Sequence, residues 1–176
     1  LLHRIEALLK KTKKLSGNIF ATGSKYLFQI NRILAVDDSP TYLEFLDLSF
    51  REDGIVIEKT TSAKDAMKKM ESELFDCVLV DLVMPEVDGI ELCQYILNKR
   101  LNKKEPMVVL MLTAHENKED MKKALDAGAD DFVGKSNDIS IIKTRLAALL
   151  RRKYIQEENR HILEELKQKE LETEKA

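Results

Sequence analysis

From residue 32 onward, hydrophobic and polar positions follow a repeating order in which short apolar runs alternate with longer amphipathic stretches. The apolar runs are hydrophobic at consecutive positions, which is typical of strands that are buried on both faces. They predict five strands, at residues 32–36, 55–59, 77–81, 107–113 and 131–133. The intervening stretches repeat their apolar residues at helical spacing, which predicts helices at 42–52, 63–70, 89–97, 118–127 and 138–150.

This alternation of strand and helix predicts an α/β fold, with a parallel sheet covered by helices on both faces. Because crossovers between parallel strands are right-handed, the helices divide between the two faces and the layout is doubly wound. Ligands of such sheets bind outside the carboxyl ends of the strands, where the strand order reverses. Candidate functional residues are therefore expected at those ends.

The segment 151–176 contains neither proline nor glycine, so we expect it to extend the last helix beyond the globular body. A helix from residue 138 to near residue 169 is on the order of 45 Å long, at about 1.5 Å per residue. A weak heptad seam runs along it, formed by Ala148, Arg152, Ile155, Asn159, Ile162 and Leu166. Two interpretations stay open: a dimer-forming coiled coil, and a solvated helix that leads to another domain.

The N-terminal residues 1–11 resemble residues 142–152, with Arg4 opposite Arg145 and Lys10-Lys11 opposite two arginines. We therefore expect 1–14 to be the C-terminal helix of a preceding copy of the same domain, or an N-terminal arm. Residues 15–31 have the composition of a linker. Chance similarity between two amphipathic helices is the alternative. The chain also begins without methionine, which favours a piece of a longer polypeptide with tandem domains.

Length and composition fit one globular domain with flanking segments, because 44% of the 176 residues are hydrophobic. No apolar stretch approaches the roughly 20 residues needed to cross a bilayer, so a cytoplasmic location is expected and no membrane partner. Cys77 and Cys93 stand within apolar patterns and are interpreted as core residues rather than as a disulfide or metal pair.

The net charge of −2 hides an uneven distribution along the chain. Residues 1–31 carry 6 basic and 1 acidic side chains, residues 32–150 carry 16 and 23, and residues 151–176 carry 7 and 7. A basic beginning could contact nucleic acid. However, its lysines close a short helix, where they complement the helix dipole. We therefore expect no nucleic-acid partner for this fragment.

Chemically reactive side chains stand at four of the predicted strand ends. Asp37 and Asp38 follow the first strand, Asp81 closes the third, Thr113 closes the fourth and Lys135 follows the fifth. Three carboxylates that meet in one cleft repel one another and lose hydration, so such a site is usually held together by a divalent cation.

These residues resemble the receiver domain of two-component response regulators over residues 32–150. The resemblance rests on Asp37-Asp38, on Asp81 followed by Met84-Pro85 and Asp88-Gly89, on Thr113-Ala114, and on Lys135, in that family's order and spacing. It implies a flavodoxin-like, five-stranded parallel sheet in the order 2-1-3-4-5 with five helices, the last one extended. The tandem similarity and the charged tail favour a parent such as a hybrid histidine kinase.

The resemblance implies that Asp81 is the phosphoacceptor, phosphorylated by a histidine kinase or a histidine phosphotransfer domain. An aspartate oxygen suits this role, since it can attack phosphorus in line and form an acyl phosphate. Mg²⁺ is the implied cofactor, bound by Asp38, Asp81, the carbonyl of Val83 and, through water, Asp37. The chain is accordingly interpreted as a switch and not as an enzyme.

Lys135, the hydroxyl of Thr113 and the amide of Ala114 are implied to contact the phosphoryl oxygens. Thr113 and Phe132 are implied to carry the conformational switch to the face formed by the fourth helix and fifth strand. Phe132 lacks the hydroxyl of the more usual tyrosine. Ser136 stands where the family usually has proline, so we expect the loop to be either trans or strained.

Two further readings of the aspartates are possible. In phosphatases of the haloacid dehalogenase type, the nucleophile follows the first strand and an acid lies two residues later, but Ser39 occupies that position after Asp37. The chain could also be a pseudo-receiver that uses the fold to dimerise. A homodimer could form through the C-terminal helix or through the face of the fourth helix and fifth strand.

Overall fold

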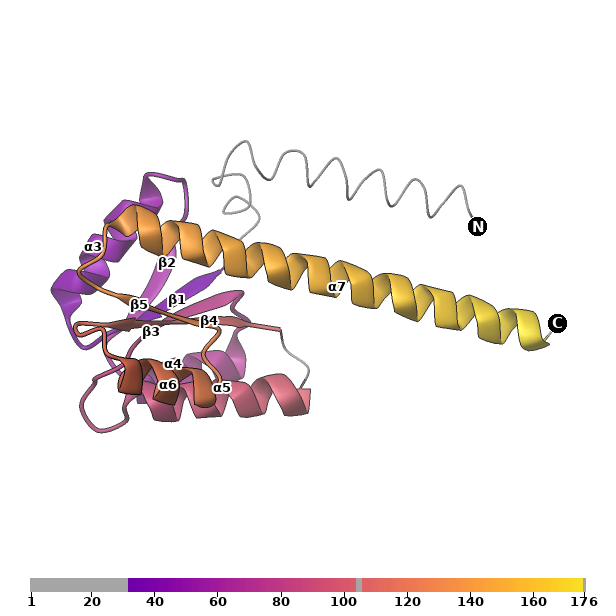
Figure 1. The fold of residues 1–176 in the computed structure, drawn as a ribbon, viewed down its shortest axis with the longest axis horizontal. Helices are drawn as coiled ribbons and strands as arrows, with labels where there is room; N and C mark the ends of the chain where they lie inside the picture. The colour runs from indigo at the N-terminus through magenta and orange to yellow at the C-terminus, as the bar shows by residue number, and fades with distance from the viewer. Residues whose placement is uncertain (1–31, 104–105, 176) are drawn as a thin grey trace.

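A computed structural model describes residues 32–103 and 106–175. Its centre is a parallel sheet in the order β2-β1-β3-β4-β5, as predicted (Figure 1). The strands are β1 (Ile33–Val36), β2 (Ile57–Thr60), β3 (Cys77–Asp81), β4 (Val108–Thr113) and β5 (Asp131–Gly134). The helices are α3 (Pro40–Arg51), α4 (Ala63–Ser72), α5 (Gly89–Lys103), α6 (Lys118–Asp126) and α7 (Ile139–Lys175). The predicted N-terminal helix 1–14 and linker 15–31 lie outside the described residues.

The helices form two layers, which confirms the doubly wound arrangement. Helices α3 and α7 cover one face of the sheet, and α4, α5 and α6 cover the other (Figure 1). The ends of β1 and β3, from which the chain leaves toward opposite layers, lie side by side because these strands are hydrogen-bonded neighbours. The reversal in strand order therefore falls beside Asp37 and Asp81.

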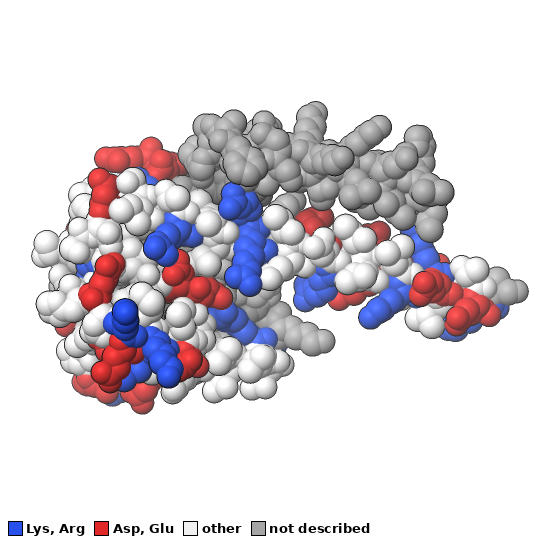
Figure 2. Space-filling view, in the orientation of Figure 1, with Lys and Arg blue, Asp and Glu red and all other residues white. Residues whose placement is uncertain are grey.

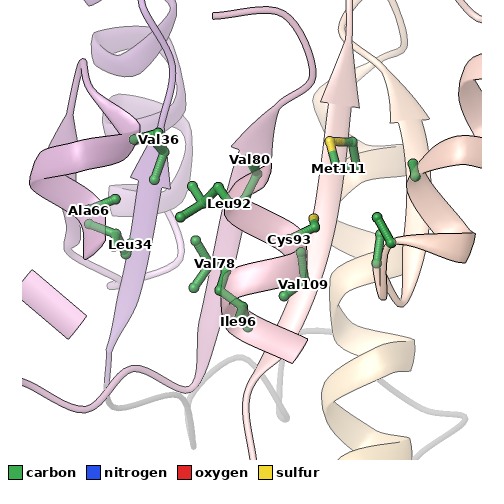
Figure 3. Packing of buried hydrophobic residues seen from close by; sticks show 14 of the residues in the cluster. Leu34, Val36, Ala66, Val78, Val80, Leu92, Cys93, Ile96, Val109 and Met111 are labelled. Atoms are coloured by element: carbon green, nitrogen blue, oxygen red, sulfur yellow. The ribbon is translucent and has the colours of Figure 1, made fainter. Parts of the chain in front are cut away.

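Successive side chains of each strand point to opposite faces of the sheet and form two separate hydrophobic cores. On the α4–α5–α6 side, β1, β3 and β4 direct their side chains against α4 and α5 (Figure 3). The residues labelled there are Leu34, Val36, Ala66, Val78, Val80, Leu92, Cys93, Ile96, Val109 and Met111. Burial of this apolar surface, at roughly 25 cal/mol per Å², is the main force that holds α4 and α5 on the sheet.

The second core lies between the sheet and helices α3 and α7. The intervening strand positions, such as Ile33 and Leu79, meet Phe50 of α3 and Leu146 of α7, all at most 1% exposed. In α7, the buried residues are Ile142, Leu146, Ala147 and Leu150. Only the first part of this helix therefore belongs to the globular body.

The predicted elements differ from the observed ones mainly in length. Helix α5 continues six residues past the predicted end at residue 97, to Lys103. There the hydrophobic periodicity weakens, but the Lys99 amine donates to the carbonyl of Met70 at 2.7 Å and Arg100 donates to that of Gly128 at 2.8 Å. Strand β2 starts two residues later than predicted, and Val56 is 70% exposed. Long-range contacts set these boundaries.

The 37 residues of α7 span about 55 Å, at about 1.5 Å per residue. Beyond the body, acidic and basic side chains alternate on the visible face of this helix (Figure 2). Ile155, on the predicted heptad seam, is 46% exposed. The extension of the last helix is confirmed, whereas its pairing as a coiled coil stays a prediction. Among the described residues, a helix both long and apolar enough to cross a bilayer is not found.

Candidate functional site

The register of the sheet brings the predicted carboxylates together. Val36 pairs with Val80, so Asp37 and Asp81 follow at neighbouring positions of adjacent strands. Asp37 is 1% exposed and Asp81 is 5% exposed, while Asp38 is exposed to solvent. One oxygen from each of the three carboxyl groups lies within 4.8 Å of the others. The sheet therefore positions three acidic groups around one point.

Helix α3 starts at Pro40, three residues after Asp37, and the residue before it, Ser39, holds the Asp37 carboxylate. The Asp37 amide donates to the Thr60 carbonyl at 3.2 Å, which continues the sheet. Asp37 Oδ1 accepts from the Ser39 amide at 2.9 Å, and the Ser39 hydroxyl accepts from the Tyr42 amide at 3.3 Å. Ser39 is thus the N-cap of α3, with Pro40 in the first turn. The carboxylate of Asp37 is thereby fixed beside the N-terminus of α3.

The loop after β3 folds back tightly against Asp81. The Gly89 amide donates to the Leu82 carbonyl at 3.0 Å, and a Cβ at Gly89 would overlap the carbonyl oxygen of Asp81. Asp88 Oδ1 accepts from the Glu91 amide at 2.9 Å, so Asp88 caps the start of α5. The pair Asp88-Gly89 therefore has a structural role, in which Asp88 caps α5 and Gly89 allows the close approach to Asp81. Val83 lies on this loop and is 72% exposed.

Lys135 reaches the carboxylates from the end of β5. Its amide donates to the Thr113 carbonyl at 2.6 Å, which anchors the residue beside β4. Its Nζ atom lies 2.5 Å from Asp37 Oδ2 and 3.0 Å from Asp81 Oδ1, and 17% of its side chain is exposed. Burial lowers the pKa of this ammonium group, but the two carboxylates outweigh burial and raise the pKa above its usual value.

Neighbouring charges shift the pKa of Asp81 in opposite directions. Burial raises the pKa of Asp81 to about 6, and the charges of Asp37 and Asp38 add to this, while Lys135 lowers it. A proton therefore competes for Asp81 in mildly acidic solution. At neutral pH the carboxylate is charged and able to act as a nucleophile or metal ligand.

Thr113 and its neighbours line the fourth strand end. Thr113 is 2% exposed, and its hydroxyl donates to the His115 carbonyl at 3.0 Å and accepts from the His115 amide at 3.2 Å. Ala114 and His115 are exposed at the mouth of the site. Phe132 is 5% exposed and packs in the core under α4, α5 and α6.

Two contacts at this edge were missed by the sequence analysis. The Lys135 Nζ atom lies over the ring of Tyr42, 4.7 Å from its centroid. Glu116 Oε1 accepts from the Gly134 amide and from the Asn137 side chain, each at 2.7 Å, and so joins the loops after β4 and β5. The spacing of Tyr42, one helical turn after Asp38, places it near the acidic residues but does not reveal its contact with Lys135, and Glu116 carries no sequence signal.

The bond between Lys135 and Ser136 is trans, because the described residues contain no cis peptide bond. Of the alternatives expected for this loop, the trans form is therefore the one observed. The loop is closed by the Asn137 amide, which donates to the Gly134 carbonyl at 3.1 Å. Lys135 is thus presented by a short turn that Glu116 also holds.

The donor set fits a small divalent cation. Mg²⁺ is bound by oxygen ligands, and the three carboxyl groups each offer one oxygen within 4.8 Å of the others. Three carboxylates and one ammonium group leave two uncompensated negative charges, which a divalent ion neutralises. Asp37, Asp38 and Asp81 are the side chains able to bind it.

Comparison with known proteins identifies the family. The profile of the response regulator receiver domain matches residues 33–147. The chain belongs to this family. Receiver domains of response regulators are regulatory modules that histidine kinases phosphorylate, and they bind Mg²⁺ at their acidic pocket. This receiver domain has such an acidic cluster, formed by Asp37, Asp38 and Asp81.

Similar proteins include response regulators with longer chains. The response regulator ArlR of Staphylococcus saprophyticus is 31% identical over 123 residues, which cover 70% of this chain and 54% of ArlR. The alkaline phosphatase synthesis transcriptional regulatory protein PhoP of Bacillus subtilis is 32% identical over 124 residues, covering 70% of this chain and 50% of PhoP. The receiver domain thus spans about half the length of these curated relatives.

Among solved structures, the signal receiver domain of a signal transduction histidine kinase from Syntrophus aciditrophicus is 30% identical. The two structures superpose with a TM-score of 0.57, over 69% of this chain and 88% of that domain. The flavodoxin-like fold inferred from the sequence is thereby confirmed. The long α7 lies largely outside the family match, which ends at residue 147.

Proposed function

We propose that this receiver domain accepts a phosphoryl group on Asp81 and changes conformation in response. The observation that carries the proposal is the convergence of Asp37, Asp38, Asp81 and Lys135 at one edge of the sheet. Three carboxylates with an ammonium group among them form a site that binds a divalent cation and attracts a phosphoryl group. Asp81 is the buried carboxylate that contacts Lys135 from the central strand β3.

The proposed reaction transfers a phosphoryl group from a phosphohistidine to Asp81. An Asp81 oxygen forms the new bond to phosphorus, and the bond from phosphorus to the imidazole nitrogen breaks with its electron pair left on the donor. Mg²⁺, held by Asp38, Asp81, the Val83 carbonyl and, through water, Asp37, would neutralise charge on the phosphoryl oxygens. Lys135 moves from the carboxylates to a phosphoryl oxygen, which it binds as a compact cation.

The switch is proposed to begin at Thr113. Its hydroxyl is bonded to the backbone of His115, and a phosphoryl oxygen competes for it as a stronger, charged acceptor. The amide of Ala114 is the second proposed donor. Movement of Thr113 alters the packing around Phe132. Phe132 is buried and lies on β5, which pairs with the strand that carries Thr113. The change reaches the outer face through α6 and β5.

A histidine kinase or a histidine phosphotransfer domain is the proposed donor. We place the receiver domain at residues 32–150 and regard 151–176 as a helical connection to an output domain. A parent such as a hybrid histidine kinase is supported by the similar receiver domain from a histidine kinase. Self-association is proposed through α7 or through α6 and β5, where Met121 and Leu125 are 41% and 44% exposed.

The decisive experiment measures phosphorylation by a small donor. The chain is incubated with acetyl phosphate and Mg²⁺, and its intact mass is measured. We expect the mass of one phosphoryl group to be gained, and expect no gain for Asp81→Asn or after chelation of the metal. Asp126→Asn, an exposed carboxylate at the end of α6, is the matched control and should be phosphorylated normally. An equal gain by Asp81→Asn would overturn the proposal.

The phosphatase alternative is tested on the same samples. Ser39, which occupies the position of the general acid in that family, is the N-cap of α3, so its hydroxyl is engaged with the backbone. We therefore expect no sustained turnover of p-nitrophenyl phosphate. Continuous release of nitrophenol that depends on Asp37 would favour a hydrolytic enzyme instead.

A further inference from the structure

The ring of Tyr42 forms one wall around the amine of Lys135. The Nζ atom lies 4.7 Å from the ring centroid, within the range of a cation–π interaction. On its other sides the amine meets Asp37 at 2.5 Å and Asp81 at 3.0 Å. The cation is therefore held between an aromatic face and two carboxylates.

The ring is a fixed support because α3 and the core hold it. Tyr42 stands in the first turn of α3, where its amide is bonded to the Ser39 cap at 3.3 Å. The side chain packs against the core between the sheet and α3 and α7, and its ring lies 5.8 Å from that of Phe45. The lysine side chain, in contrast, is a flexible four-carbon stem, so its amine keeps one position only when neighbouring residues hold it.

We propose that Tyr42 is a positioning residue for phosphoryl transfer and acts through Lys135. The proposal rests on the function proposed above for Asp81. When a phosphoryl group arrives, the amine of Lys135 leaves the carboxylates for a phosphoryl oxygen. The contact with the aromatic face does not depend on the charge of those carboxylates. The ring thus keeps the amine near the reacting atoms, which lowers the entropy lost on reaching the transition state.

The ring and not the hydroxyl carries this role. The Tyr42 hydroxyl is buried and makes no hydrogen bond with the described residues. A phenylalanine at this position keeps the aromatic face, whereas a leucine removes it. The two substitutions therefore separate the proposed contact from every effect of the hydroxyl.

The test compares rates of phosphorylation by acetyl phosphate in the presence of Mg²⁺. At saturating donor we expect Tyr42→Leu to lower the rate constant about three- to fivefold, the size of a partly exposed cation–π contact. Tyr42→Phe should stay within twofold of the wild type. Tyr95→Leu is the matched control, because it removes a tyrosine ring on α5 that also contacts a lysine amine, that of Lys99, and it should leave the rate unchanged.

A double-mutant cycle with Lys135→Gln distinguishes positioning from a general effect on the fold. If Tyr42 acts through Lys135, Tyr42→Leu has little further effect on the rate once the amine is gone. Where phosphorylation of the Lys135→Gln proteins is too slow to measure, thermal unfolding of the same four proteins replaces it. Tyr42→Leu should then lower Tm by less in the Lys135→Gln background than in the wild type.

The outcomes are separable. A wild-type chain that takes no phosphoryl group defeats the function proposed for Asp81, and the Tm cycle still tests the contact between Tyr42 and Lys135. A phosphorylated wild type with an unchanged Tyr42→Leu rate overturns only the inference about Tyr42. Tyr42→Phe as slow as Tyr42→Leu overturns it too, as does an equal effect of Tyr42→Leu in both backgrounds.

Discussion

The carboxyl group of Asp81 lies where burial and two neighbouring carboxylates oppose its ionisation. Lys135 compensates only in part, so the pKa is raised to about 6. The folded protein therefore binds a proton at Asp81 more tightly than the unfolded chain does. At neutral pH the ionised Asp81 carboxylate therefore destabilises the metal-free folded protein. A bound divalent cation would offset this destabilisation, so the burial of Asp81 favours binding of the cation.

Asp81→Asn should stabilise the metal-free protein at neutral pH. Below about pH 4 the group is protonated in both folded and unfolded states, and its favourable contribution is lost as the pH rises through about 6. The rise of the Asp81 pKa from 3.8 to about 6 corresponds to roughly 3 kcal/mol. We expect a gain of roughly 2 to 3 kcal/mol in urea unfolding at pH 7.5 with chelator, shrinking toward zero near pH 4.

The matched control for this measurement is Asp126→Asn, because residue 126 is exposed. Its unfolding free energy should change by less than about 0.5 kcal/mol, as is usual for surface positions. If Asp81→Asn left the unfolding free energy unchanged or lowered it at pH 7.5, the ionised carboxylate would not destabilise the folded state.

The loops at the carboxyl edge determine how the strand ends are presented. Glu116 is the described residue that ties the loop after β4, which carries Thr113, to the loop after β5, which carries Lys135. It does so by accepting from the amide of Gly134, and a side chain at that glycine would overlap Glu116. The position of Lys135 thus depends on a residue that is itself exposed.

Glu116→Ala should destabilise the protein by about 1 to 2 kcal/mol, because it leaves the amide of buried Gly134 without its acceptor. Glu116→Gln retains an acceptor oxygen and should cost less than about 0.5 kcal/mol. Both values are measured by urea unfolding. Equal losses for the two variants would show that the charge, rather than the accepted hydrogen bond, is what stabilises the loops.

At the scale of the whole molecule, the protein combines a compact body with a long projecting helix (Figure 1). All buried residues of α7 lie between Ile142 and Leu150. Lys153 adds a contact with Asp76 at 3.5 Å. The projecting part therefore contributes little to the described core.

Removal of residues 157–176 should leave the body folded. The described residues in this segment include none that is buried, so we expect Tm to change by less than about 3 °C. The rate of phosphorylation by acetyl phosphate should also be unchanged. A much larger fall in Tm would mean that the tail stabilises the body, and sedimentation of both chains would show whether the tail mediates dimerisation.

The sequence predicted the number, kind and order of the described elements better than their ends. Helix α5 was predicted too short because its last turn depends on Lys99 and Arg100, which bond to α4 and to the turn before β5. Tyr42 and Glu116 were missed for a related reason. Their contacts with Lys135 and Gly134 join residues far apart along the chain, which local periodicity cannot reveal.

The amino-acid sequence by itself determined the alternation of buried strands and amphipathic helices, and hence which side chains follow the strand ends. It could do so because strand burial and helical amphipathicity are local patterns in one dimension. Only the tertiary structure decided which side chains touch Lys135, which loops are tied together and where the helices stop. These features depend on register and on packing between distant segments, and both arise only when the sheet and its two helical layers assemble.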